Sequence, residues 1–158
     1  LQLIDGIGNN LMGAAATVAM DEMNNYLLFA LSNPVSSSSP FILKHMPLNT
    51  NLAVGGKSKL QFANFMSEYD TLNFYWNHSL KAQVAFASIS NAIEITPTLK
   101  DTLQVYKGSG SAAQLIAESN GKLITKQNNY IVTACYTTQN PTIGNLAQQQ
   151  IKWISQIK

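Results

Sequence analysis

The sequence predicts a mainly α-helical fold, a single helical domain over residues 1–158 with one small β-hairpin before its C-terminal helix. Three observations lead to this prediction. Long stretches place apolar residues three or four positions apart, which is the period of an amphipathic helix. Residues that cap helices stand before several of these stretches. A later segment between Lys122 and Thr137 is instead rich in β-branched and aromatic residues, which are typical of strands.

The first predicted helix lies within residues 1–31. Gly6, Gly8 and Gly13 each cost about 1 kcal/mol in a helix interior, so either the helix begins near Asn9 or these glycines allow a partner to approach closely. The prolines and serines of residues 32–40 then predict a loop. One face of the helix is expected to be buried, because its apolar residues recur with helical spacing. These residues are Met12, Ala16, Ala19, Met23, Leu27 and Leu31.

The strongest helical pattern lies between Leu60 and Ile95. Apolar side chains step by three or four positions through this stretch, which predicts one long bent helix or two consecutive helices. Pro97 ends the pattern, because the residue before a proline is disfavoured in the helical conformation. The apolar positions are Phe62, Phe65, Tyr69, Leu72, Trp76, Ala82, Phe86, Ile89 and Ile93.

Two short helices are predicted in the middle of the chain. Thr98 and Asp101 have the spacing of a capping box, so a helix that reaches Tyr106 is expected after them. Ser111 is a suitable N-cap for the second helix, and Gly121 is a typical residue after a helix C-terminus. Both helices would be about two turns long.

The predicted hairpin joins two short strands, residues 122–126 and 130–137, through a polar turn. Asn140 and Pro141 then supply an N-cap and a first helical residue, so the last helix is expected to run from there to the end of the chain. The chain starts with Leu1 and stops within this apolar pattern, and we therefore expect a mature or trimmed part of a longer protein. The apolar pattern consists of Ile143, Leu146, Ala147, Ile151, Trp153, Ile154 and Ile157.

The composition predicts a neutral surface rich in hydrogen-bonding groups. Charged residues make up 11% of the chain, against about 25% in an ordinary globular domain. The chain holds 16 Asn, 11 Gln, 14 Ser and 11 Thr, and it has no arginine. With a net charge of +2 it lacks the basic stripe that neutralises phosphates, so nucleic acid is not an expected partner.

The same composition favours an extracytoplasmic protein, either periplasmic or secreted. Cys135 is the single cysteine, so it adds no evidence for an oxidising compartment. No apolar run reaches the roughly 18 residues that a membrane-spanning helix needs, because acidic residues or lysines interrupt each candidate. We therefore predict no transmembrane segment in this sequence.

No motif in the sequence predicts a cofactor, a metal site or a catalytic set. Residues 55–58 match the end of a phosphate-binding P-loop, but Asn51 stands where that motif requires a glycine. His45 and His78 are the two histidines, and they lack the companions of a zinc site. Asp70 is eight positions from His78, too far along a helix for a direct hydrogen bond.

These observations together predict a non-enzymatic module for protein interaction or assembly, which docks protein partners or self-associates. An extracytoplasmic component of a bacterial secretion apparatus of the type IV kind, or of a pilus, is the most specific form of this expectation. The neutral surface and the small residues of the first helix support it. The residues expected at the interface are Met12, Met23, Leu27, Leu31, Phe74, Tyr75, Leu146, Trp153 and Ile157.

Two other classes of protein are alternatives. A carrier of a small apolar ligand would have an aromatic pocket within residues 62–76. An enzyme would need a cleft that joins His78, Asp70 and a hydroxyl side chain in three dimensions. The positions of these residues in the structure separate the alternatives.

Overall fold

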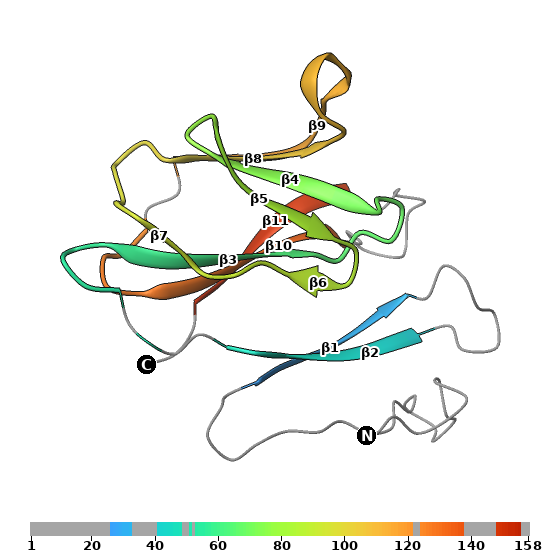
Figure 1. The fold of residues 1–158 in the computed structure, drawn as a ribbon, viewed down its shortest axis with the longest axis horizontal. Coiled ribbons are helices and arrows are strands. Elements are labelled where there is room, and N and C mark those ends of the chain that lie inside the picture. The colour runs from blue at the N-terminus through green and yellow to red at the C-terminus, as the bar shows by residue number, and fades with distance from the viewer. Residues whose placement is uncertain are drawn as a thin grey trace. The chain divides into compact units, whose positions relative to one another are not determined.

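The computed structural model describes residues 26–32, 41–48, 51, 53–121, 124–137 and 148–155. The chain divides into two compact units, 1–49 and 50–158, which are described separately (Figure 1). Strands form almost all of the regular structure, so the prediction of a mainly α-helical domain is wrong. Within the described residues the one helical segment is a single 3-10 turn, Gly110–Ala112, and no helix is long or apolar enough to cross a membrane.

The described part of the first unit is an antiparallel pair of strands, β1 (Tyr26–Ser32) and β2 (Phe41–Pro47). Their register pairs Tyr26 with Pro47 at one end and Ser32 with Phe41 at the other. Leu27 and Leu31, which we predicted on a helix face, therefore lie in a strand. The rest of that predicted helix lies outside the described residues.

The second unit contains a five-stranded sheet in the order β11-β10-β3-β6, with β7 also paired to β3. β10 runs parallel to β3 and antiparallel to β11, and β3 is antiparallel to both β6 and β7. β3 and β10, which are far apart in the sequence, thus lie side by side (Figure 1). The strands are β3 (Ser58–Asn64), β6 (Ser88–Ile89), β7 (Ile93–Ile95), β10 (Asn129–Thr137) and β11 (Gln148–Ser155).

A four-stranded sheet completes the second unit, in the order β5-β4-β8-β9 with all neighbours antiparallel. A register shift occurs in β4 opposite β5 and another in β8 opposite β9. The strands are β4 (Thr71–Trp76), β5 (Ser79–Ala85), β8 (Thr102–Lys107) and β9 (Gln114–Asn120).

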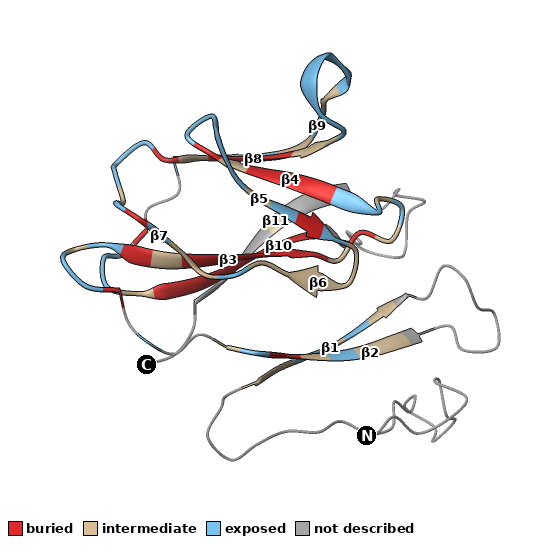
Figure 2. Ribbon diagram, in the orientation of Figure 1, coloured by how far each residue is buried: buried red, intermediate tan, exposed pale blue. Residues whose placement is uncertain are grey.

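The hydrophobic core lies between the two sheets, as in a β-sandwich. Figure 2 shows the buried positions concentrated on β3, β4, β8 and β10. Phe62 of β3 and Phe74 of β4 stack with their ring centroids 5.0 Å apart, so one aromatic pair joins the two sheets. The main members of the core are Leu60, Phe62, Leu72, Phe74, Trp76, Leu103, Val105 and Val132.

The stretch from Leu60 to Ile95 forms short strands: β3 is buried at six of its seven positions, and the core side chains of β4 alternate. Leu72, Phe74 and Trp76 occupy every second position of β4, which places all three on one face of the sheet. The helical spacing arose from Phe65 and Tyr69, which lie in the connection between β3 and β4. The predicted helix therefore combined side chains of two strands with those of the connection.

The two predicted middle helices are also replaced by strands. The backbone N–H of Thr98 donates to Asp101 Oδ2 at 2.7 Å, as in a capping box, but this contact closes a turn ahead of β8. A strand follows because residues 102–106 alternate between polar and apolar side chains. The second predicted helix is the 3-10 turn followed by β9.

The end of the chain differs from the prediction in its pairing and in its last element. β10 covers the predicted strand 130–137, but its partners are β3 and β11. Residues 124–128 form a turn, so the described part of 122–126 is no hairpin strand. β11 takes the place of the predicted C-terminal helix over residues 148–155. The remainder of that helix lies outside the described residues.

Asn64 links the end of β3 to its surroundings through a fully buried side chain. Its amide nitrogen donates to the carbonyl oxygens of Tyr69 at 2.9 Å and Val84 at 3.3 Å. Its amide oxygen accepts the backbone N–H of Met66 at 3.0 Å. A buried polar group is stable when it is hydrogen-bonded in this way, so Asn64 fixes the connection between the two sheets.

Candidate binding pocket

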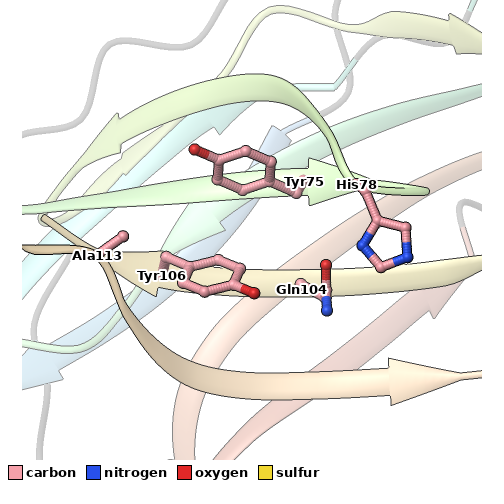
Figure 3. A pocket seen from close by; sticks show the side chains of 5 residues that line it. All are labelled: Tyr75, His78, Gln104, Tyr106 and Ala113. Carbon is pink, nitrogen blue, oxygen red and sulfur yellow. The ribbon is translucent and has the colours of Figure 1, made fainter. Parts of the chain in front are cut away.

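The outer face of the four-stranded sheet carries a pocket of about 250 Å³. Since Phe74 and Val105 face the core, their neighbours along β4 and β8 face away from it. Figure 3 shows Gln104 and His78 toward one end of the pocket and Ala113 toward the other, with the two tyrosine rings between them. We call this site the tyrosine pocket, and its lining residues are Tyr75, His78, Gln104, Tyr106 and Ala113.

The two tyrosines come from adjacent central strands. Tyr75 is paired with Gln104, and Asn73 with Tyr106, so the tyrosines are diagonal neighbours on one face. Their ring centroids lie 5.3 Å apart with the planes at 72°, an edge-to-face arrangement that aromatic quadrupoles favour. Both residues are half-buried. The pair therefore holds its geometry through contacts within the chain.

Gln104 is a largely buried residue whose side chain forms no hydrogen bond with any other described residue, while its amide atoms stay open to solvent at the pocket. Only 9% of this residue is exposed, and its side chain lines the pocket (Figure 3). Asn73, its neighbour on the same face, differs: Asn73 donates to the Gly108 carbonyl at 2.6 Å and accepts from Gln83 at 2.9 Å. An amide that is open to solvent and has no partner within the chain can exchange its hydrogen bonds to water for bonds to a ligand. The amide of Gln104 is therefore available to a ligand.

His78 reaches the pocket from the turn between β4 and β5. Asn77 and His78 have φ of 48° and 63°, and positive φ at both central residues is what a type I′ hairpin turn requires. Asn77 exchanges two hydrogen bonds with Thr102, through its backbone N–H at 2.9 Å and its side-chain oxygen at 2.8 Å. These bonds attach the turn to the start of β8.

Asp101 also stabilises this turn through hydrogen bonds. Its carboxyl group is fully buried and accepts from the side-chain nitrogen of Asn77 at 2.8 Å. It also accepts from the backbone N–H and the hydroxyl of Thr98, at 2.7 and 2.8 Å. The backbone that positions His78 is thus held by hydrogen bonds that converge on one buried carboxyl group.

Two exposed leucines flank the tyrosines on the outer edge strands. Leu80 of β5 is opposite Tyr75 and is 47% exposed, and Leu115 of β9 is opposite Tyr106 and is 44% exposed. Glu118 is exposed opposite Gln104. The pocket therefore has apolar flanks on both sides and one acidic residue in the neighbouring register position.

The residues predicted at an interface are distributed over different parts of the structure. Phe74 is fully buried in the core, whereas Tyr75, the next residue, lines the pocket on the opposite face. Leu27 and Leu31 lie in β1, and the backbone of Trp153 lies in β11 opposite Val132. The predicted interface residues outside the described part of the chain are Met12, Met23, Leu146 and Ile157.

The histidine and aspartate considered for catalysis do not meet. Asp70 precedes β4 and His78 follows it, so the strand separates them by about 20 Å at 3.3 Å per residue. In the glycine-rich segment that resembled a P-loop, Lys57 forms an exposed ion pair with Glu94 at 3.1 Å. Within the described residues, no three His, Cys, Asp or Glu side chains gather in a group that could hold a metal ion.

Two sequence signals point to the pocket but were masked by the helical period. The polar and apolar alternation of residues 102–106 places Gln104 and Tyr106 on the face opposite Leu103. The Asn77–His78 pair between two apolar runs is a hairpin signal, because asparagine tolerates positive φ. Ala113 has no comparable signal, since only the pairing of β8 with β9 brings it to the site.

Fold and site together define a β-sandwich with a small pocket of aromatic and amide groups on the outer face of one sheet. No protein-family model, no curated protein and no solved structure matches this chain. The chemistry of the tyrosine pocket is therefore the basis for assigning a function.

Proposed function

We propose that this chain is a non-enzymatic interaction module that recognises its partner through the tyrosine pocket. The observation that carries the proposal is Gln104, a residue that is 9% exposed, lines the pocket and has no hydrogen-bond partner among the described residues. Its amide atoms are open to solvent at the pocket, so they can form hydrogen bonds to a ligand in place of those to water.

The rigidity of the site supports a role in recognition. The edge-to-face tyrosine pair and the buried Asp101 network hold the pocket walls on paired strands. A preorganised site loses little conformational entropy when a ligand binds, so even a small contact area can give useful affinity. Sites on strands are also held more accurately than sites on mobile loops.

The positions of the other candidate groups favour this class over the alternatives. Phe62 and Trp76 pack into the core between the sheets, whereas a carrier of an apolar ligand would need them to line a cavity. The separation of Asp70 from His78 removes the one acid–base pair that the sequence offered an enzyme. A place for this module in an exported bacterial secretion or pilus apparatus stays a prediction from composition.

The direct test compares binding by the full chain and by the double variant Y75A/Y106A. Both proteins are immobilised and exposed to probes of three classes: unstructured peptides, neutral oligosaccharides and acidic oligosaccharides. We expect one class to bind and to lose at least tenfold in affinity in the double variant. V54S serves as a control, because Val54 is 72% exposed in the turn before β3, in the other sheet. Binding that is equal in all three proteins, or absent throughout, would overturn the proposal.

A further inference from the structure

We propose that the ligand of the tyrosine pocket is a neutral carbohydrate, with one sugar ring of an oligosaccharide seated against Tyr75, Gln104 and Tyr106. This inference rests on the proposed function, since it names the ligand class of the same site. Four properties of the pocket support it: its size, its aromatic surface, its hydrogen-bonding groups and its lack of charged side chains.

The size of the pocket fits a single sugar ring. Its volume of about 250 Å³ is below the range of roughly 300–1,000 Å³ that is typical of sites for drug-sized ligands. The pocket also opens on the outer face of the sheet (Figure 3). A small ring can therefore enter while the rest of a longer chain stays outside.

The tyrosine rings match the apolar side of a sugar. A pyranose presents C–H groups on its ring faces and hydroxyl groups around its edge. Aromatic faces carry partial negative charge and attract such polarised C–H groups. Tyr75 and Tyr106 are half-buried and lie 5.3 Å apart, so part of each ring remains accessible to a ligand.

The polar groups of the pocket match hydroxyl groups, which both donate and accept hydrogen bonds. The amide of Gln104 has two N–H donors and one carbonyl acceptor, and each tyrosine hydroxyl does both. The imidazole nitrogens of His78 add further hydrogen-bonding capacity at the same end of the pocket. A ligand that only accepts or only donates would leave part of this set unused.

The absence of charge among the lining residues favours a neutral ligand. None of the five residues that line the pocket is a lysine, an aspartate or a glutamate. Glu118 is directly opposite Gln104 in the sheet register, and its carboxylate would repel an acidic sugar. A phosphate or a uronic acid would therefore lose its hydration without gaining an ion pair.

The position of the pocket in the sheet argues against a peptide ligand. Extended peptides commonly bind by pairing with the edge of a sheet, where backbone groups are unpaired. Tyr75 and Gln104 lie on β4 and β8, and each of these strands is paired on both sides. The backbone groups of these two strands are used within the sheet, so recognition depends on side chains alone.

The test titrates the full chain with defined neutral oligosaccharides and follows the ring signals of Tyr75 and Tyr106 by NMR. We expect a saturable shift of both signals with at least one neutral oligosaccharide at millimolar concentration, and binding at least tenfold weaker for acidic oligosaccharides. Calorimetry on Q104L should show at least a tenfold loss of affinity, and V54S should bind as the wild type does. The signal assignments use Y75F and Y106F, which keep the rings and remove one hydroxyl each.

The outcomes separate this inference from the function on which it rests. Tyrosine-dependent binding of a peptide or an acidic oligosaccharide, with no response to neutral sugars, would overturn the carbohydrate assignment and leave the interaction module in place. No tyrosine-dependent binding of any probe would overturn both. A methyl glycoside that binds about as tightly as the oligosaccharide would support a pocket that takes one sugar ring. If Q104L does not fold, the NMR titration of the wild type still decides the ligand class.

Discussion

The two faces of the four-stranded sheet are built from alternate residues of the same strands, yet they have different properties. The inner face places Phe74 and Val105 in a sealed core, where both are fully buried. The outer face places Tyr75, Gln104 and Tyr106 around a pocket, with an amide that is open to solvent and has no partner among the described residues. Neighbouring residues thus divide into a set that stabilises the fold and a set that is available for recognition.

The largest expected difference is between F74A and Y75A, which truncate adjacent aromatic residues on opposite faces. Removal of a buried phenylalanine leaves a cavity and typically costs about 3–5 kcal/mol. Y75A loses mainly one edge-to-face contact, which is worth about 1 kcal/mol. Urea denaturation followed by circular dichroism measures both free energies of unfolding. Equal losses in the two variants would contradict the assignment of the faces.

The second comparison is between two aspartates: Asp101, whose buried carboxyl group is hydrogen-bonded, and Asp70, which is exposed. D101A removes the acceptor of three hydrogen bonds, from the backbone N–H and hydroxyl of Thr98 and from the amide of Asn77, and each bond contributes about 0.5–1.5 kcal/mol. We expect a loss of about 3 kcal/mol and weaker ligand binding, because the turn that carries His78 is released. D70A is the control, since Asp70 is exposed and its change should stay within about 0.5 kcal/mol. The same denaturation assay measures both, and a D101A protein as stable as D70A would show that the network does not stabilise the turn.

Substitution by leucine should affect stability less at Gln104 than at Gln61, a buried glutamine that has a hydrogen-bond partner. Q104L replaces an amide that is open to solvent and has no partner among the described residues by an apolar group of similar size, so stability should stay within about 0.5 kcal/mol of the wild type. Q61L is the matched control, because Gln61 is also buried but donates to the Ser90 carbonyl at 3.4 Å. That variant should lose about 1 kcal/mol. Thermal and urea denaturation measure both, and a clear destabilisation of Q104L would indicate a structural role for the amide.

The physical reason for the wrong fold class lies in short strands and their connections. β4 has six residues and only three inward positions, so its alternation is brief. Phe65 and Tyr69 in the preceding connection then complete a helical spacing by coincidence. Pairing between β10 and β3 joins segments about 70 residues apart, and no local pattern encodes such a contact.

The pocket was partly accessible to sequence reasoning. Tyr75 was indicated because it departs from the apolar stripe, and it does line the pocket. His78 was indicated for a different chemistry. Gln104 and Tyr106 come to the site only because β8 pairs with β4, and Ala113 because β9 pairs with β8. A recognition site that forms across strands therefore becomes visible only when the register is known.

The smallest expected effect is that of H78G on stability. This variant tests whether His78 serves the pocket although its side chain is unfavourable in the turn. A non-glycine residue at positive φ costs about 1–2 kcal/mol, and His78 has a φ of 63°. Glycine relieves this strain but makes the unfolded chain more flexible, which offsets about 0.5–1 kcal/mol of the gain. H78G should therefore stabilise the protein by roughly 0.5 kcal/mol, or a rise of about 1–2 °C in Tm.

The same variant should weaken ligand binding, because the imidazole that lines the pocket is lost. A87G is the matched control, since Ala87 has a similar φ of 55° in the turn between β5 and β6 and does not line the pocket. It should stabilise the protein by a similar amount and leave affinity unchanged. If H78G is more stable and binds as tightly as the wild type, His78 takes no part in recognition. If both variants are destabilised, the two turns do not store the strain that their backbone angles indicate.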